Sequence, residues 1–186
     1  LRVHMDITSR EPRIYLGPRE LMDYDAIIEA LNGQAALLEG PLPSNLGDFH
    51  NPNLDIYRYD MDKAKAALAE AGAEYNKGGF ELEYVYVTGL QIEEQIGLIM
   101  LDKLSQLDIT VKVTPMVWPD MVARAQDIEA SPHMMAVYSG TSFADPDNFL
   151  WQAYHSTQAG FWAAARTAQI VQGWTLHPGN IDELIL

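Results

Sequence analysis

A strand–helix–strand pattern between residues 78 and 118 limits the folds that this chain can adopt. Residues 80–87 are rich in aromatic and β-branched side chains, and their first half alternates apolar with acidic residues, which is typical of a strand. Apolar residues then recur at helical spacing over residues 96–107, and residues 109–114 return to strict alternation. The short joints predict a right-handed crossover that connects two parallel strands.

The rest of the chain predicts helices that would cover such a sheet. Apolar residues at helical spacing indicate helices over residues 20–31 and 61–71, and Asp60 suits the N-cap of the second. The apolar run over residues 134–138 is typical of a buried parallel strand. Asp145-Pro146 favours the start of another helix. We therefore expect an α/β fold, a mixed sheet with packed helices, in one domain over residues 1–186.

Two further segments have weaker patterns. Residues 3–7 alternate apolar with polar side chains and predict a first strand. Residues 40–59 are rich in Gly and Pro and predict a long segment of extended chain and turns. The apolar residues that could anchor this segment are Leu42, Leu46, Phe49, Leu54 and Ile56.

Composition excludes several classes of function. The formal net charge of −14 argues against a nucleic-acid partner and against docking on anionic lipid. The absence of cysteine excludes disulfides, thiolate metal sites and cysteine nucleophiles. No apolar run approaches the roughly 20 residues of a membrane-spanning helix. The chain begins without an initiator methionine and ends within a helix-like stretch, so we expect a fragment of a longer protein.

The polar residues do not form a recognisable catalytic pattern. The five histidines are scattered, and no pair has the spacing of a helical metal site. Asp145 and Asp147 lack the glycine and the distal glutamate of a calcium loop, and N-capping accounts for Asp145. A Gly-x-Ser-x-Gly motif and a phosphate-binding loop are both absent. We expect no metal, no cofactor and no enzyme activity.

Candidate binding residues follow the predicted strands, because ligands of parallel sheets lie beyond the carboxyl ends of the strands. These ends carry an aromatic side chain, small hydroxyl groups and glycines, a combination suited to binding rather than to catalysis. The alternative is that Trp118 is a core aromatic residue and the serines belong to an ordinary loop. The candidate ligand-binding residues are Thr88, Trp118, Ser139, Gly140, Thr141 and Ser142.

An ordered set of motifs resembles one family of transport proteins. Residues 59–72, YDMDKAKAALAEAG, closely resemble a signature of bacterial ABC-transporter extracellular solute-binding proteins of family 5, the peptide, oligopeptide and nickel-binding type. Further matches in the family's order are residues 23–28, 40–43, 80–87, 101–113, 118, 144–150, 154–156 and 180–185.

The resemblance implies one lobe of a two-lobed, type II periplasmic-binding-protein-like fold. It implies that this chain is the C-terminal, distal lobe, which captures a peptide-like or other small polar solute and delivers it to the ABC permease. A monomer is expected, periplasmic or extracellular and associated with the membrane through an N-terminal anchor that is missing here or through the permease. In peptide-binding members, an aspartate that pairs with the peptide's amino terminus precedes the Asp-Pro turn, whereas Ser142 takes that position here.

Two alternative functions remain at this point. The first is a small α/β hydrolase-type enzyme that uses Asp, His or Ser. The second is a lobe that only docks on the permease and has no ligand of its own. Turnover assays on esters and peptides separate the enzyme from a binding protein.

Overall fold

The structure is a computed structural model that describes residues 21–38, 40, 42–54, 58–71, 79–126, 130, 132–137, 143 and 145–154. Its centre is a sheet of β1 (Glu81–Val87), β2 (Thr110–Met116) and β3 (Met134–Met135) in the order β2-β1-β3. Both strand pairings are parallel. The predicted α/β class and the three predicted strands in one sheet are confirmed.

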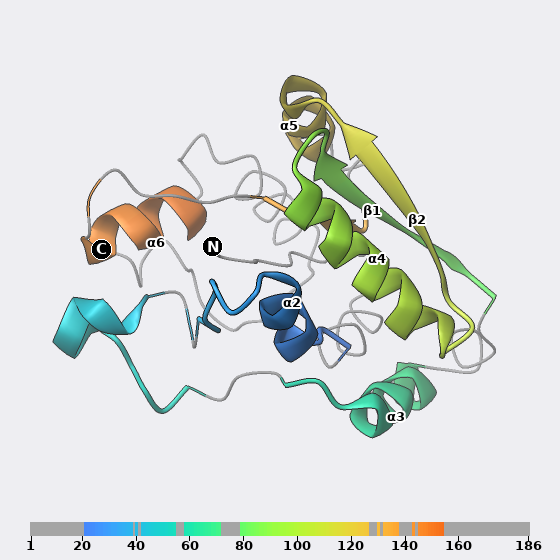
Figure 1. The fold of residues 1–186 in the computed structure, drawn as a ribbon, viewed down its shortest axis with the longest axis horizontal. Helices are drawn as coiled ribbons and strands as arrows, with labels where there is room; N and C mark the ends of the chain where they lie inside the picture. Colours follow the sequence, from blue (N-terminus) through green and yellow to red (C-terminus); the bar gives the residue numbers. More distant parts are fainter. Residues whose placement is uncertain are drawn as a thin grey trace.

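The strand–helix–strand unit also forms as predicted. Helix α4 (Gln91–Ser105) connects β1 to β2, and the register places Glu81 opposite Thr110 and Val87 opposite Met116. Figure 1 shows α4 lying along one face of these two strands, with both arrows pointing toward α5. The carboxyl ends of β1 and β2 therefore lie at the same edge of the sheet.

The main core fills the space between the sheet and α4, and it includes α2 (Tyr24–Ala30) and α3 (Met61–Ala71). Tyr84 of β1 is fully buried there, and its hydroxyl donates to the backbone oxygen of Glu93 at 2.6 Å. Gly97 of α4 faces the Tyr84 ring, so the helix can lie close to the sheet. Other buried members are Leu21, Met22, Ile27, Ala64, Leu68, Leu82, Tyr86, Ile96, Met100, Leu104, Ile109, Val111, Met134 and Ala136.

A smaller core lies on the opposite face of the sheet. Helix α5 (Trp118–Gln126) packs Met121 and Ala125 against Val85 of β1 and Met135 of β3. The sheet therefore has a helix on each face, as buried parallel strands require.

Helix α2 and the segment after it differ from the predicted pattern. The helix begins only at Tyr24, because Asp23 is its N-cap and accepts from the Ala26 N–H at 3.0 Å. Within the predicted stretch of extended chain and turns, residues 44–49 form the 3₁₀ helix η1 (Ser44–Phe49), interrupted at Gly47. Of the expected anchors, Leu42 is buried, whereas Phe49 and Leu54 are exposed.

The third strand is shorter than predicted. After Met135 the Ala136 N–H still donates to Val85 O at 3.0 Å, but the strand itself has two residues instead of the expected five. Helix α6 (Pro146–Tyr154) follows, and Asp145 Oδ1 accepts from the Asp147 N–H at 3.0 Å, which confirms the predicted N-cap. The strand predicted at residues 3–7 lies outside the described residues.

Candidate functional site

The candidate site lies at the carboxyl ends of β1 and β2. After β1, Thr88 and Gly89 turn into α4, and after β2, Val117 leads into Trp118, the first residue of α5. The Thr88 N–H donates to Met116 O at 2.8 Å and ties the two strand ends together. Two predicted site residues, Thr88 and Trp118, therefore follow strands that end at the same edge of the sheet.

This edge presents apolar surface to solvent. Trp118 is 44% exposed and Val117 is 53% exposed, so Trp118 is not the core aromatic residue of the alternative interpretation. Thr88 beside them is also exposed. Val117 was not among the predicted site residues. The sequence feature that could have identified Val117 is its position, as an apolar residue between the last strand residue and a helix that begins with Trp-Pro.

The predicted residues Ser139, Gly140, Thr141 and Ser142 lie outside the described residues. The structure does describe Phe143, which follows them and is 65% exposed. Its backbone oxygen accepts from the Asp145 N–H at 3.1 Å and from Asn148 Nδ2 at 3.4 Å, so the start of α6 holds its main chain. The sequence feature that could have identified Phe143 as a candidate site residue is a large aromatic side chain that follows several small polar ones.

A buried carboxylate lies at the joint between β1 and α4. Glu93 is 2% exposed, although it is an acidic residue in the first turn of α4. Its Oε2 accepts from the Val87 N–H at 2.8 Å. The helical spacing of apolar residues contains no sign of this bond, because the partner is a backbone group of another element.

An ion pair fixes α5 on its face of the sheet. Both terminal guanidinium nitrogens of Arg124 donate to the Glu83 carboxylate of β1, and Arg124 Nε donates to Ala130 O at 2.8 Å. The Arg124 hydrogen bonds hold the pKa of Glu83 below its usual value, against the effect of burial, with a further contribution from the Thr114 hydroxyl. Glu83 is therefore charged at neutral pH, and α5 has a fixed orientation.

The described residues do not assemble a catalytic or metal-binding group. Both described histidines use a ring nitrogen on the backbone: His50 Nδ1 donates to Leu42 O at 2.8 Å, and His133 Nδ1 accepts from the Glu83 N–H at 3.0 Å. Within the same ranges, no group of three or more His, Cys, Asp or Glu side chains is placed to hold a metal ion. The arrangement at the strand ends can bind a molecule by stacking and by hydrogen bonding.

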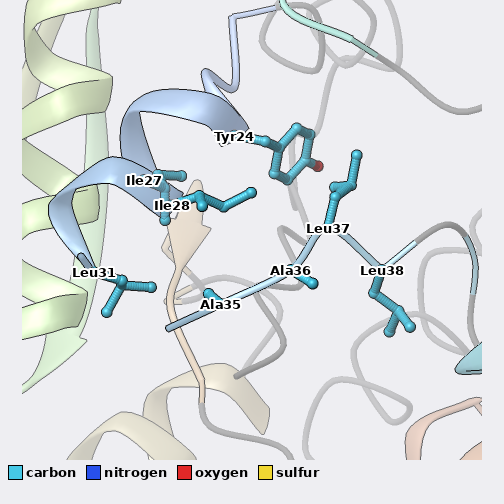
Figure 2. Close-up of a pocket in the computed structure, with 8 residues that line it drawn as sticks. All are labelled: Tyr24, Ile27, Ile28, Leu31, Ala35, Ala36, Leu37 and Leu38. Atoms are coloured by element: carbon cyan, nitrogen blue, oxygen red, sulfur yellow. The ribbon is translucent and has the colours of Figure 1, made fainter. Parts of the chain in front are cut away.

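A small apolar pocket of about 60 Å³ lies elsewhere, between α2 and the extended segment after it. Figure 2 shows the α2 side chains on one side and residues 35–38 on the other, with the Tyr24 ring directed toward Leu37. The lining has one hydroxyl, that of Tyr24, and no charged group. This pocket contains none of the predicted site residues.

Comparison with known proteins gives one family match and several relatives. The sequence profile described as "Bacterial extracellular solute-binding proteins, family 5 Middle" matches residues 20–161. Heme-binding protein A of Haemophilus influenzae is 33% identical over 147 residues, or 75% of this chain and 25% of that protein. The dipeptide-binding protein of Escherichia coli K12 is 30% identical over 131 residues, or 67% of this chain and 23% of that protein.

The chain therefore spans about a quarter of the length of these two curated relatives. Solved structures agree in fold. HbpA2 from Haemophilus parasuis superposes with a TM-score of 0.72 at 22% identity, covering 98% of this chain and 38% of that one. The periplasmic binding protein DppA from Helicobacter pylori, solved with the peptide STSA, gives 0.72 at 22% identity, covering 88% and 32%. The fold is that of part of a type II periplasmic binding protein.

Proposed function

Because this chain belongs to the bacterial extracellular solute-binding proteins of family 5, we propose that it is a ligand-binding lobe of an ABC importer's solute-binding component. It captures a peptide-like or other small polar solute and delivers it to the permease. The observation that carries this proposal is the exposed pair Val117 and Trp118 beside the Thr88 turn, at the carboxyl ends of two parallel strands. Ligands of parallel sheets bind at this edge.

Trp118 is the proposed anchor of the solute. A tryptophan side chain offers a large and rigid apolar surface with one hydrogen-bond donor, and both are useful for holding a small polar molecule. Thr88 adds a hydroxyl group beside it. Ser139, Gly140, Thr141 and Ser142 follow β3 in the sequence, and we assign them to the same site on the family's pattern.

The proposal extends to the whole protein. Residues 1–186 form one domain, the C-terminal lobe. This lobe and a second one close around the ligand. The protein works as a monomer in the periplasm or outside the cell, held near the membrane by an N-terminal anchor or by its contact with the permease. It binds no nucleic acid, in keeping with the net charge of −14.

A binding protein without enzyme activity fits the described residues better than a hydrolase. Both described histidines already have a backbone partner: Leu42 O for His50 and the Glu83 N–H for His133. Incubation with generic esters and peptides should give no turnover above buffer. Turnover that disappears when a single histidine is replaced would favour the hydrolase instead.

Calorimetry tests the proposed site. We would titrate the dipeptide Ala-Phe, heme and maltose into the 186-residue chain and into a longer protein that adds the second lobe. We expect weak or unmeasurable binding to the chain alone, since a half-cleft leaves the ligand partly solvated. In the longer protein, Trp118→Ala should weaken the binding of whichever probe is held by about tenfold or more.

Phe49→Ala is the matched control, because Phe49 is an aromatic residue on η1 with 67% exposure. The helix η1, cyan in Figure 1, lies far from the carboxyl ends of β1 and β2. Ser142→Asp should shift the preference toward the dipeptide, whose free amine gains a charged partner. If both Trp118→Ala and Ser142→Asp bind every probe like the parent, the strand-end residues are not the site. If none of the three probes binds but the purified permease binds the protein, the docking-only function gains support.

A further inference from the structure

The edge of β1 that faces β3 is completed by side chains instead of by a long strand. β3 has only two residues, which pair with Tyr84 and Val85. On this edge, the Glu83 N–H donates to His133 Nδ1 at 3.0 Å, before β3 begins. The Val87 N–H donates to Glu93 Oε2 at 2.8 Å, beyond the end of β3. Backbone N–H groups inside a protein need such acceptors, because an unpaired one is costly.

The Glu93 bond lies directly beneath the proposed binding edge. Val87 is the last residue of β1, and Thr88 and Gly89 follow it. Leu90 N–H donates back to Val87 O at 3.0 Å, and the Glu93 and Glu94 N–H groups donate to Leu90 O. One carboxylate therefore connects the end of β1 to the first turn of α4 across a turn of three residues.

A further hydrogen bond connects the Thr88 turn to the strand that precedes Trp118. The Thr88 N–H donates to Met116 O at 2.8 Å, and Met116 is two residues before Trp118. One hydrogen bond thus links the main chain after Val87 to the main chain that leads into Trp118. Tyr84 secures the base of the arrangement, because its hydroxyl donates to the Glu93 backbone oxygen at 2.6 Å.

We propose that Glu93 is a positioning residue of the binding edge: its buried carboxylate holds the Val87 N–H and thereby sets the Thr88 turn and, through Met116, the place of Trp118. The carboxylate does not contact the solute. Its burial at 2% exposure is explained by this role, since a glutamate in the first turn of a helix would otherwise remain in water. The part of this inference that concerns the solute depends on the proposed function.

Amide hydrogen exchange on the full 186-residue chain tests the positioning role without any ligand. Glu93→Leu removes the acceptor at similar volume, Glu93→Asp keeps the carboxyl group but shortens its reach, and Glu93→Gln keeps an oxygen that accepts from the Val87 N–H. We expect exchange at both Val87 and Thr88 to rise by about tenfold or more in Glu93→Leu, relative to Met100 in the interior of α4. Glu93→Asp should give a smaller rise, and Glu93→Gln should stay near the parent.

The Thr88 amide decides the result, because Glu93 does not bond to it. Unchanged exchange at Thr88, or equal acceleration at Thr88 and Met100, would overturn the proposal, since the first shows no transmission and the second only global destabilisation. Gln95→Leu is the matched control for adding a leucine to an exposed position on the same helix. If Glu93→Leu does not fold, the comparison of Glu93→Asp with Glu93→Gln decides in the same way.

Titration of Ala-Phe into the longer protein tests the consequence for binding. We expect Glu93→Leu to weaken the affinity by about tenfold, with recovery in Glu93→Gln and no change in Gln95→Leu. Equal affinity in Glu93→Leu and the parent would overturn the role at the binding edge. If the parent holds neither Ala-Phe, heme nor maltose, the proposed function fails, and the Thr88 exchange rates alone then decide whether Glu93 positions the turn.

Discussion

At the scale of single residues, Gly97 shows how closely α4 approaches the sheet. A Cβ atom at this position would lie 2.5 Å from Tyr84 Cε1 and 3.1 Å from Val113 Cγ1. Tyr84 cannot move aside easily, because its ring is buried and its hydroxyl is bonded to Glu93. The close approach therefore depends on the missing side chain.

We expect Gly97→Ala to lower the free energy of unfolding by roughly 1–2 kcal/mol. Overpacking in a core costs about 1–3 kcal/mol, whereas alanine gains at most about 1 kcal/mol in helix propensity. Urea unfolding measures the difference, and Leu98→Ala, at an exposed neighbouring position, is the control with little expected change. A Gly97→Ala variant as stable as the parent would mean that α4 can shift away from the sheet.

A charged pair gives the second residue-scale prediction. The pKa of Glu83 is lowered below 4.5 mainly by its hydrogen bonds from Arg124. A carboxyl group with a lowered folded-state pKa stabilises the fold above its unfolded pKa, and this stabilisation is lost as the pH falls through the folded-state pKa. The pair should therefore stabilise the protein at neutral pH and lose this contribution as the pH falls through the lowered pKa of Glu83.

Arg124→Met should lower the free energy of unfolding by roughly 1.5–3 kcal/mol at neutral pH, the range for hydrogen bonds to a charged group. The difference between parent and variant should shrink as the pH falls below the ordinary pKa of a glutamate and through the lowered pKa of Glu83. Urea unfolding at several pH values measures it, and Lys112→Met, whose amine is 3.9 Å from Glu83 and mostly exposed, should have a much smaller effect. A difference that stays constant with pH would contradict the assignment.

At the scale of elements, α4 carries leucines on both its buried face and its exposed face. Leu104 is fully buried, whereas Leu101 is 39% exposed. Leu104→Ala should cost about 2–5 kcal/mol of unfolding free energy, because it leaves a cavity in the main core. Leu101→Ala is the matched control and should cost far less. Similar thermal midpoints for the two variants would show that the buried face of α4 is assigned incorrectly.

The elements also show which patterns in the sequence were sufficient. The alternation in the first half of residues 80–87 and the helical spacing in residues 96–107 predicted β1 and α4, although β1 buries side chains on both faces and α4 on one. The apolar run over residues 134–138 predicted a strand but not its length, because an apolar run does not show where pairing stops. The predicted helix began before Tyr24 because the residues there are apolar. The structure shows that Leu21 and Met22 are buried but lie outside the helix.

The candidate site was predictable in its position but not in its support. Strand order and the parallel connection placed Thr88 and Trp118 at one edge, and exposure agrees with that placement. Glu93 could not be found in this way, because its bond to Val87 joins a side chain to a backbone group and leaves no periodic signal. Whether Thr88 and Trp118 bind a solute stays a prediction.

At the scale of the whole molecule, the two cores differ in size. Among the described residues, the core under α4 joins three helices to the sheet, whereas the core under α5 has four buried residues: Val85, Met121, Ala125 and Met135. This difference between the cores should make α5 the less stable of the two helices that cover the sheet.

A membrane-spanning helix was not expected from the sequence. The described residues contain no helix with the length and hydrophobicity that a membrane span requires.

We expect α5 to open locally before the molecule unfolds as a whole. Native-state hydrogen exchange should give lower opening free energies for amides of α5 than for those of α4, because a smaller apolar area holds α5 in place. Met121→Ala should widen this gap without changing the exchange of the α4 amides. Equal opening free energies in both helices would show that the two cores unfold as one cooperative unit.

The brevity of β3 has a consequence for the order in which the sheet folds. β1, α4 and β2 are consecutive in the chain, so their pairing closes a loop already shortened by a helix, whereas the Glu83–His133 contact spans 50 residues. Loop closure costs more entropy over a longer separation. A folding nucleus of β1, α4 and β2 that β3 joins late follows from this topology. Substitutions in β3 such as Met135→Ala should then speed unfolding while leaving the folding rate nearly unchanged.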